Sequence, residues 1–280
     1  MKPVTLWALA LTLTSTPATL AQTPEWHAHY RMTPSEYQQT FDHYTSLGYV
    51  LNSVSGYERA SEANYAAIFE QTDRGAWRSN HGMTSAEYVA KNAGFEEQGY
   101  HVRQVNGYNV DGEAVYAAIW EVEPEEVHKR ITYHNLTASE MQERVDCYMK
   151  EGYRPSHISG YEIGGSPYFA VIFEYIADDA AWWAWGQLSS SEYQARFDEY
   201  LADGYRLRDV SGYSVGDDVF FVGIWDNSTA PGAWSARHGM DSSTFQSEFD
   251  KFKGEGYVLE VLSGYSTGAG DRYAALWAKA

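Results

Sequence analysis

Apolar and polar residues follow one pattern along this chain, and the pattern recurs five times with a period of about 52 residues. Each copy opens on Trp, or once on Arg, and closes on an apolar run such as YAAIFE or FVGIWD. Two Gly-Tyr pairs, eight residues apart, lie between these ends. The pattern predicts a single domain over residues 22–280, built from repeats at residues 26–70, 77–121, 130–174, 182–226 and 234–278.

Each repeat contains one predicted helix that begins at a capping box. A Thr or Ser is followed three residues later by Glu, so that hydroxyl and carboxylate each accept a hydrogen bond from a free backbone N–H. The pairs are Thr33 and Glu36, Thr84 and Glu87, Thr137 and Glu140, and Ser189 and Glu192. In the fifth copy Asp241 keeps the cap without the Glu. Apolar residues at helical spacing then predict one buried face, and the first Gly-Tyr pair predicts a left-handed helix end.

Three strands are expected in each repeat, one before the helix and two after it. Stretches such as GYRLRDVSGYSV are rich in β-branched and aromatic residues, which favour strands. A turn such as Asp111-Gly112 follows and predicts a hairpin that returns through the apolar run. The unit is therefore strand, helix, strand, strand, and the predicted fold class is α+β with mainly antiparallel sheet.

We expect the array of repeats to close into a ring or a propeller-like arrangement. An open solenoid needs terminal units with polar outer faces. Here the first copy is as aromatic as the others, and the last predicted strand reaches Trp277. Closure would let the first strand pair with the last unit, which would remove the exposed sheet edges.

The motifs of the repeat resemble those of a known family. The series W-x-x-x-H-G-M, capped E-Y helix, G-Y-x-x-x-x-V-S-G-Y and Y-A-A-I-W is similar to the bacterial tandem repeat module, which itself resembles the N-terminal repeat region of secreted polyglycine hydrolases. The resemblance implies an extracellular repeat domain of helices and antiparallel sheet. In those hydrolases catalysis is associated with a separate serine β-lactamase-like domain, and this sequence contains no Ser-x-x-Lys. The resemblance thus implies the accessory part without the enzyme.

The first 21 residues have the pattern of a secretory signal peptide, with Lys2, an apolar run and small residues up to Ala21. We therefore expect a secreted protein, extracellular or periplasmic, with no membrane attachment after cleavage. The formal net charge is −18, and loss of Lys2 makes it more negative. Such a surface excludes nucleic acid as a partner, because affinity for phosphates comes from Lys and Arg.

Three histidines, His81, His134 and His238, occupy one position of the repeat, three residues before the helix cap. In a closed array they would lie on a circle, where they can face a metal or an anion. The circle is expected to hold them too far apart for zinc, whose ligands lie about 2 Å from the metal. The other interpretation is that each packs beside the Trp of its repeat and bonds a local carbonyl or carboxylate. We assign no metal and no cofactor from the sequence.

Trp183 and Trp185 fall outside the repeating pattern, beside the repeat residue Trp182. Exposed tryptophans suit stacking on sugar rings or flat polymer surfaces. The alternative is a locally thicker core that compensates for Gly186, where three other copies have His. Both interpretations stay open at this point.

Two stretches match the Gly-x-Ser-x-Gly pattern of a serine hydrolase, around Ser214 and Ser266. That motif needs a strand followed by a helix, whereas these segments are expected to enter hairpins. No catalytic residue is assigned. The sequence therefore favours a secreted, non-catalytic repeat module that binds an extracellular polymer, glycan or peptide, or a protein partner. The alternatives are a hydrolase-related accessory protein or an enzyme with a Ser/His site in the repeats, and an envelope structural protein.

Overall fold

The computed structural model describes residues 24–122, 130–176, 180–228 and 232–279, and the expected leader lies outside these residues. Within them every repeat contains a strand, a helix and two further strands, as predicted, and the fold class is α+β. The strands are β1 (Trp26–Met32), β2 (Val50–Arg59), β3 (Glu62–Glu70), β4 (Trp77–Thr84), β5 (Tyr100–Val110), β6 (Glu113–Val122), β7 (Arg130–Leu136), β8 (Tyr153–Ile163), β9 (Ser166–Tyr175), β10 (Trp182–Ser189), β11 (Arg206–Val215), β12 (Asp218–Asp226), β13 (Trp234–Met240), β14 (Val258–Thr267) and β15 (Gly270–Ala278). The helices are α1 (Pro34–Ser46), α2 (Ser85–Glu96), α3 (Ala138–Met149), α4 (Ser190–Ala202) and α5 (Ser242–Gly254).

Reciprocal caps begin four of the five helices. The backbone N–H of Thr33 donates to the Glu36 carboxylate at 2.8 Å, and the N–H of Glu36 donates to the Thr33 hydroxyl at 3.4 Å. The same pair of bonds begins α2, α3 and α4, and Asp241 caps α5 by accepting from the N–H of Thr244 at 2.7 Å. The predicted helix starts are therefore confirmed.

The glycine of the first Gly-Tyr pair in each repeat ends the helix. Gly48 has a φ of +85°, and Gly99, Gly152, Gly204 and Gly256 have similar positive values. Glycine adopts this left-handed conformation without the steric cost that a Cβ atom would add. The chain can therefore reverse directly from the helix into the second strand of the repeat.

Each repeat forms its own three-stranded antiparallel sheet, and no sheet of the described residues extends over two repeats. In the first repeat β3 lies in the middle, between β1 and β2. The last strand of a repeat is thus the central one, and residues 64–70 are all buried because both faces are covered. The expected pairing of the first strand with the last unit is wrong, since β1 pairs with β3 of its own repeat.

The hydrophobic cores lie between neighbouring repeats. One cluster joins Tyr65 of the first repeat to Tyr108 of the second, and three others join the following pairs of repeats in the same way. A fifth cluster joins Tyr57 of the first repeat to Trp277 of the last. No described repeat has a cluster of its own, so each depends on its neighbours for burial.

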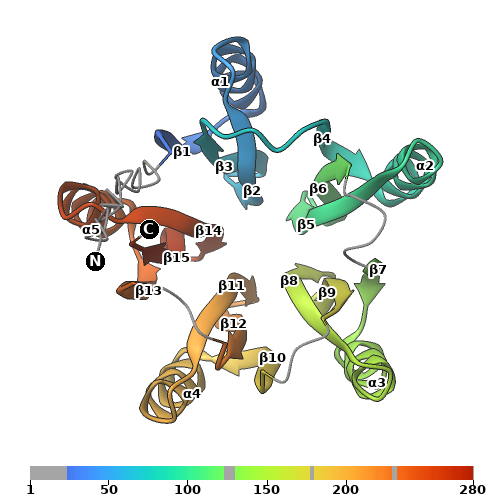
Figure 1. Ribbon diagram of the computed structural model, residues 1–280, viewed down its shortest axis with the longest axis vertical. Helices are drawn as coiled ribbons and strands as arrows, with labels where there is room; N and C mark the ends of the chain where they lie inside the picture. The colour runs from blue at the N-terminus through green and yellow to red at the C-terminus, as the bar shows by residue number, and fades with distance from the viewer. Residues whose placement is uncertain (1–23, 123–129, 177–179, 229–231, 280) are drawn as a thin grey trace, which may run out of the picture.

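The repeats lie around a common centre (Figure 1). The second strand of each repeat, which we call the inner strand, is nearest this centre, and the helices lie at the periphery (Figure 1). The inner strands are β2, β5, β8, β11 and β14. Every inner strand contacts the inner strands of two other repeats, and β14 of the last repeat contacts β2 of the first. The residues that vary along these strands are therefore brought together at the centre.

Candidate functional site

Trp183 forms an exposed aromatic platform on the edge strand β10. Its side chain is 46% exposed, and its indole stacks on the ring of Tyr200 from α4, with centroids 5.7 Å apart and planes 6° apart. Tyr200 itself is buried. The core therefore supports the indole from one side, and the exposed part is held flat on a rigid element, as contact with a planar ligand surface requires.

Trp185, two residues further along β10, has a less accessible side chain than Trp183. Its Nε1–H donates to the Tyr200 hydroxyl at 2.8 Å, and the Arg196 guanidinium lies over its ring, with Cζ 4.7 Å from the ring centroid. Met141 of α3 contacts Gly186, so this side chain from the preceding repeat fills the position where other copies have His. Trp185 is thus mainly a packing residue, while Trp183 has the accessible surface.

The platform belongs to the fourth repeat alone. The residues at the position of Trp183 in the other repeats are His27, Arg78, Ile131 and Ser235. These residues share the same place on an edge strand but differ in charge and shape. The backbone of the edge strand is the same in every repeat, and the side chain at this position varies. Such a constant frame with variable side chains is typical of a binding surface.

The three histidines lie between repeats, one in each of three separate contacts. His81 packs edge-on against Tyr37 and Tyr65 of the preceding repeat, with ring centroids 4.6 and 5.1 Å apart. His134 contacts Tyr88 and Tyr116, and His238 contacts Tyr193 and Phe221, in the same way. The ring contacts are with the preceding repeat, whereas the sequence suggested the Trp of the same repeat.

Two of these histidines lie within hydrogen-bond distance of a serine of the preceding repeat. Nε2 of His134 lies 2.8 Å from the Ser85 hydroxyl, and Nε2 of His238 lies 3.3 Å from the Ser190 hydroxyl. Within the described part of the chain, no group of three His, Cys, Asp or Glu side chains has the arrangement of a metal site. Their ring contacts place the three imidazoles in the packing between repeats.

The contacts between repeats are expected to weaken in mild acid. Burial lowers the pKa of His81, His134 and His238 below the ordinary value of 6.5. In the unfolded chain these groups bind protons as the pH falls through 6.5, while the folded protein keeps them neutral, so the free energy of unfolding falls below that pH. Urea unfolding at pH 7.5 and pH 5.5 measures this loss.

The matched control for the acid effect is the variant His81→Gln/His134→Gln/His238→Gln. It is expected to lose less free energy of unfolding between the two pH values than the wild type does. An equal loss in both proteins would show that the three histidines do not cause the effect.

A circuit of hydrogen bonds connects the inner strands. In each repeat, the backbone N–H of the glycine in the second Gly-Tyr pair donates to a Ser or Asn side chain of the following repeat. The last repeat donates to the first in the same way. The five bonds are Gly56 N to Asn106 Oδ1 (2.6 Å), Gly107 N to Ser159 Oγ (3.1 Å), Gly160 N to Ser211 Oγ (3.2 Å), Gly212 N to Ser263 Oγ (3.0 Å) and Gly264 N to Ser55 Oγ (3.0 Å). Because each inner strand is the edge of its sheet, these bonds satisfy N–H groups that lack a strand partner.

The tyrosine after each of these glycines packs on the glycine of another repeat. Tyr161 of the third repeat lies over Gly107 of the second, and its hydroxyl is 2.8 Å from the Tyr116 hydroxyl. Tyr57 of the first repeat lies over Gly264 of the last in the same way. Burial raises the pKa of Tyr57 and Tyr161 to about 12, so both hydroxyls stay protonated at neutral pH. Glycine and tyrosine of one pair thus face two different neighbours.

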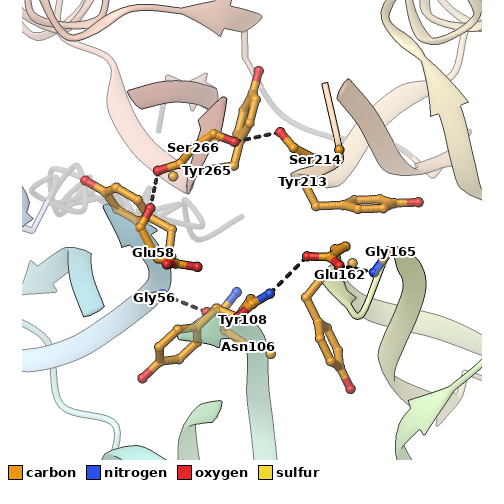
Figure 2. A pocket seen from close by; sticks show the side chains of 18 residues that line it. Gly56, Glu58, Asn106, Tyr108, Glu162, Gly165, Tyr213, Ser214, Tyr265 and Ser266 are labelled. Atoms are coloured by element: carbon orange, nitrogen blue, oxygen red, sulfur yellow. Dashed lines mark hydrogen bonds between the residues drawn. The ribbon is translucent and has the colours of Figure 1, made fainter. Parts of the chain in front are cut away.

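A cavity of about 360 Å³ lies at the hairpin end of the inner strands, and all five repeats line it (Figure 2). We call it the axial cavity. Besides Asn106, five polar side chains line it from one position of the repeat, directly after the packed tyrosine, and they are Glu58, Asn109, Glu162, Ser214 and Ser266. Five equivalent positions therefore carry three different residue types around one space.

A second cavity of about 240 Å³ is lined by residues from the first half of the inner strands and by Glu174 of β9. Its charges are paired with one another or with the sheets behind them. Nδ1 of His157 lies 2.8 Å from Asp209 Oδ2, Arg208 Nε lies 2.8 Å from Asp226, and Glu260 lies 2.6 Å from Arg206. These ion pairs are made within the protein, which indicates that the charged groups here have a structural role.

Ser214 and Ser266 line the axial cavity but are not placed as hydrolase nucleophiles. Each lies near the end of an inner strand that enters a hairpin, β11 into β12 and β14 into β15. The Ser214 hydroxyl donates to the Ser266 carbonyl at 2.6 Å, and the Ser266 hydroxyl donates to the Glu58 carbonyl (Figure 2). No histidine is among the described residues that line this cavity.

No site at the axial cavity was predicted from the sequence, although the sequence contains a pattern that points to one. Along the inner strand the residues before the tyrosine are nearly constant, with an aliphatic residue, Ser or Asn, and Gly in every copy. The next position changes from Glu to Asn to Ser. A variable polar position within a constant strand marked this place, but only the arrangement around the centre shows that the five side chains meet.

Comparison with known proteins identifies the repeat. A family model described as polyglycine hydrolase-like, structural repeat, matches residues 23–72, 74–122, 128–176, 179–228 and 231–280. These five matches coincide with the five units of strand, helix and two strands. A search of the curated proteins found no match.

Proposed function

We propose a binding function without catalysis for this chain, which belongs to the polyglycine hydrolase-like structural repeat family. In this proposal the chain is a secreted module whose ligand is an extracellular polymer, a glycan or a peptide chain. The repeats act as the frame, since their capping boxes, glycines and tyrosines have structural roles. The ligand contacts a surface where the repeats differ from one another.

The observation that carries this proposal is the exposed indole of Trp183. Few large apolar side chains among the described residues are exposed, and Trp183 is the one tryptophan among them. Its stacking on Tyr200 restrains the ring, so that binding costs less side-chain entropy than it would for a freely rotating side chain. A rigid aromatic anchor of this kind often dominates the free energy of binding.

Replacement of Trp183 by Ala is expected to weaken binding of a polymer ligand by about tenfold or more, because a tryptophan anchor contributes about 2 kcal/mol. The measurement is a glycan and peptide array, followed by titration with whichever polymer binds. The change in melting temperature should be small, since the side chain is 46% exposed.

Arg78→Ala supplies the matched control, because Arg78 occupies the same position of the second repeat. It should leave binding unchanged. Equal affinity of the wild type and the Trp183→Ala variant, or no binding to any polymer, would contradict the proposal.

We propose that the protein acts outside the cytoplasm, after removal of residues 1–21. The pattern of the leader and the acidic composition support this location. Among the described residues, no helix is both long and apolar enough to cross a bilayer. N-terminal sequencing of the exported protein should begin near Gln22, and an uncleaved Met1 would contradict the proposal.

We also propose that the five repeats form a closed, propeller-like ring in solution. The support is the set of contacts between the last repeat and the first, which repeats the contacts between the other neighbours. These include the bond from Gly264 to Ser55 and the packing of Tyr57 on Gly264. Small-angle scattering should give a radius of gyration near the value of about 18 Å for a compact domain of this length. A clearly elongated particle would contradict the ring.

A further inference from the structure

We propose that the axial cavity binds a primary alkylammonium group, the chemistry of a lysine side chain or a free alkylamine. The proposal rests on the charge of the cavity, the direction of its hydrogen bonds and its partly apolar lining. It is independent of the Trp183 platform, which lies on an edge strand at the outer part of the fourth repeat.

The charge of the lining favours a cation. Glu58 and Glu162 contribute two carboxylates, and no Lys or Arg is among the described residues that line the cavity. The neighbouring Arg59 does not neutralise the charge of Glu58, because its Nε lies 3.2 Å from Asp271 Oδ2 instead. Figure 2 shows the side chains of Glu58 and Glu162 approaching from opposite sides of the cavity.

The two carboxylates differ in the number of hydrogen bonds that they accept. Glu162 accepts a hydrogen bond from Asn109 Nδ2 at 2.9 Å and another from the backbone N–H of Gly165. The Glu58 carboxylate, in contrast, has no hydrogen bond or ion pair with any described residue. Glu58 is therefore the group with free capacity for a ligand, and Glu162 is a fixed second charge.

The two serine hydroxyls of the lining can only accept from a ligand. Ser214 uses its proton on the Ser266 carbonyl, and Ser266 uses its proton on the Glu58 carbonyl. Each hydroxyl oxygen keeps lone pairs but has no proton left to donate. The cavity thus offers acceptors on several sides, and an ammonium group, with three donors and no acceptor, matches this arrangement.

The size and lining favour an organic cation over a bare metal ion. The volume of about 360 Å³ is in the range of small-molecule sites. The exposed lining is more apolar than polar, since glycine Cα atoms and tyrosine rings form its wall. An alkyl chain can occupy this wall region while the ammonium group reaches Glu58.

The test is a calorimetric titration of the full mature chain with Nα-acetyl-lysine N-methylamide. The neutral control ligand is Nα-acetyl-norleucine N-methylamide, which keeps the alkyl chain and removes the ammonium group. We expect the lysine derivative to bind at least about tenfold more tightly, since hydrogen bonds to charged groups are stronger than those between neutral groups. Equal binding of both, or no binding of the lysine derivative, would overturn the proposal.

The variant Glu58→Gln should weaken binding of the lysine derivative by about tenfold or more, with the melting temperature unchanged because its carboxylate has no partner to lose. Glu62→Gln removes the same charge from an exposed position of the first repeat outside the lining, and it should bind as the wild type does. An equal loss in both variants would overturn the proposal, because it would indicate general attraction to an acidic protein. An unchanged affinity of Glu58→Gln would do so as well.

Two ligands distinguish the source of the ammonium group. n-Butylammonium represents a free amine, and a five-residue peptide with a central Lys represents a protein or peptide partner. Tighter binding of the peptide would support a partner that inserts a lysine into the cavity. Similar affinities would support a free amine as the ligand.

Discussion

Replacement of Gly107 by Ala is expected to lower the free energy of unfolding by about 2–3 kcal/mol and the melting temperature by about 5–10 °C. A Cβ atom at Gly107 would lie 2.5 Å from Cδ1 of Tyr161. The ring of Tyr161 is buried, and its hydroxyl is bonded to Tyr116 and to the N–H of Asn135, so it cannot move without losing these contacts. Thermal unfolding of the two proteins measures the difference.

Gly94→Ala is the matched control in the same repeat. Gly94 lies within α2, and a Cβ atom there would have no neighbour within 4 Å. Glycine inside a helix costs about 0.5–1 kcal/mol relative to Ala, so Gly94→Ala should stabilise the protein by about that amount. The two substitutions should therefore change stability in opposite directions, and a similar loss in both would contradict the packing argument.

A double-mutant cycle tests whether Tyr161 is the cause. In a Tyr161→Ala background, Gly107→Ala should cost much less than in the wild type, because the clashing ring is absent. An undiminished cost would assign the effect to the backbone of the inner strand instead.

Replacement of Asp271 by Asn should destabilise the contact between the last repeat and the first by about 1–3 kcal/mol, below the cost for a fully buried ion pair. Asp271 Oδ2 lies 3.0 Å from Arg31 Nε and 3.2 Å from Arg59 Nε. The carboxylate is buried, but the two arginines are 41% and 43% exposed and can be rehydrated, which reduces the loss. Urea unfolding and small-angle scattering in intermediate urea measure stability and size together.

We call the contact between the last repeat and the first the seam. Glu260→Gln is its control, because Glu260 pairs with Arg206 between the fourth and fifth repeats. Those repeats are consecutive in the chain, so the polypeptide still holds them together when their contact is weakened. We expect a larger radius of gyration before global unfolding only for Asp271→Asn. Identical scattering from both variants would contradict a special role of the seam.

The seam residues are recognisable in the sequence only in retrospect. Asp271 occupies a position where the other copies have Ala63, Ala114, Pro167 and Val219. Arg31 has a φ of +59° at a position where the second and fifth copies have Gly82 and Gly239. Both departures can be seen by aligning the repeats. That they face each other follows only from the contact between residues more than 200 positions apart in the chain.

The local structure of the repeat was predictable because its causes are local. A capping box acts over three residues, as at Thr33 and Glu36, and a left-handed glycine ends the helix within a turn. Hydrophobic periodicity distinguishes helix from strand over about ten residues. Five copies of the same signals made the order of strand, helix, strand and strand clear, and the structure agrees with it.

The strand pairing across the array was not predictable in the same way. The sequence suggested that closure pairs β1 with the last unit, yet every sheet stays within its repeat. The reason is that the neighbouring sheets meet through side chains, with Ser55 satisfying Gly264 and Tyr57 covering it. Edges that are satisfied by side chains do not need a strand partner.

The sequence by itself determined the repeat, its elements and the positions at which the copies differ. Only the tertiary structure decided which of those positions meet. Glu58 and Glu162 are two repeats apart and reach one cavity because their strands approach the same centre, whereas Trp183 lies on an outer strand and is exposed. The physical reason is that the cores form between repeats: packing of each tyrosine on another repeat's glycine sets the distance between inner strands, and that distance is not encoded in any one copy.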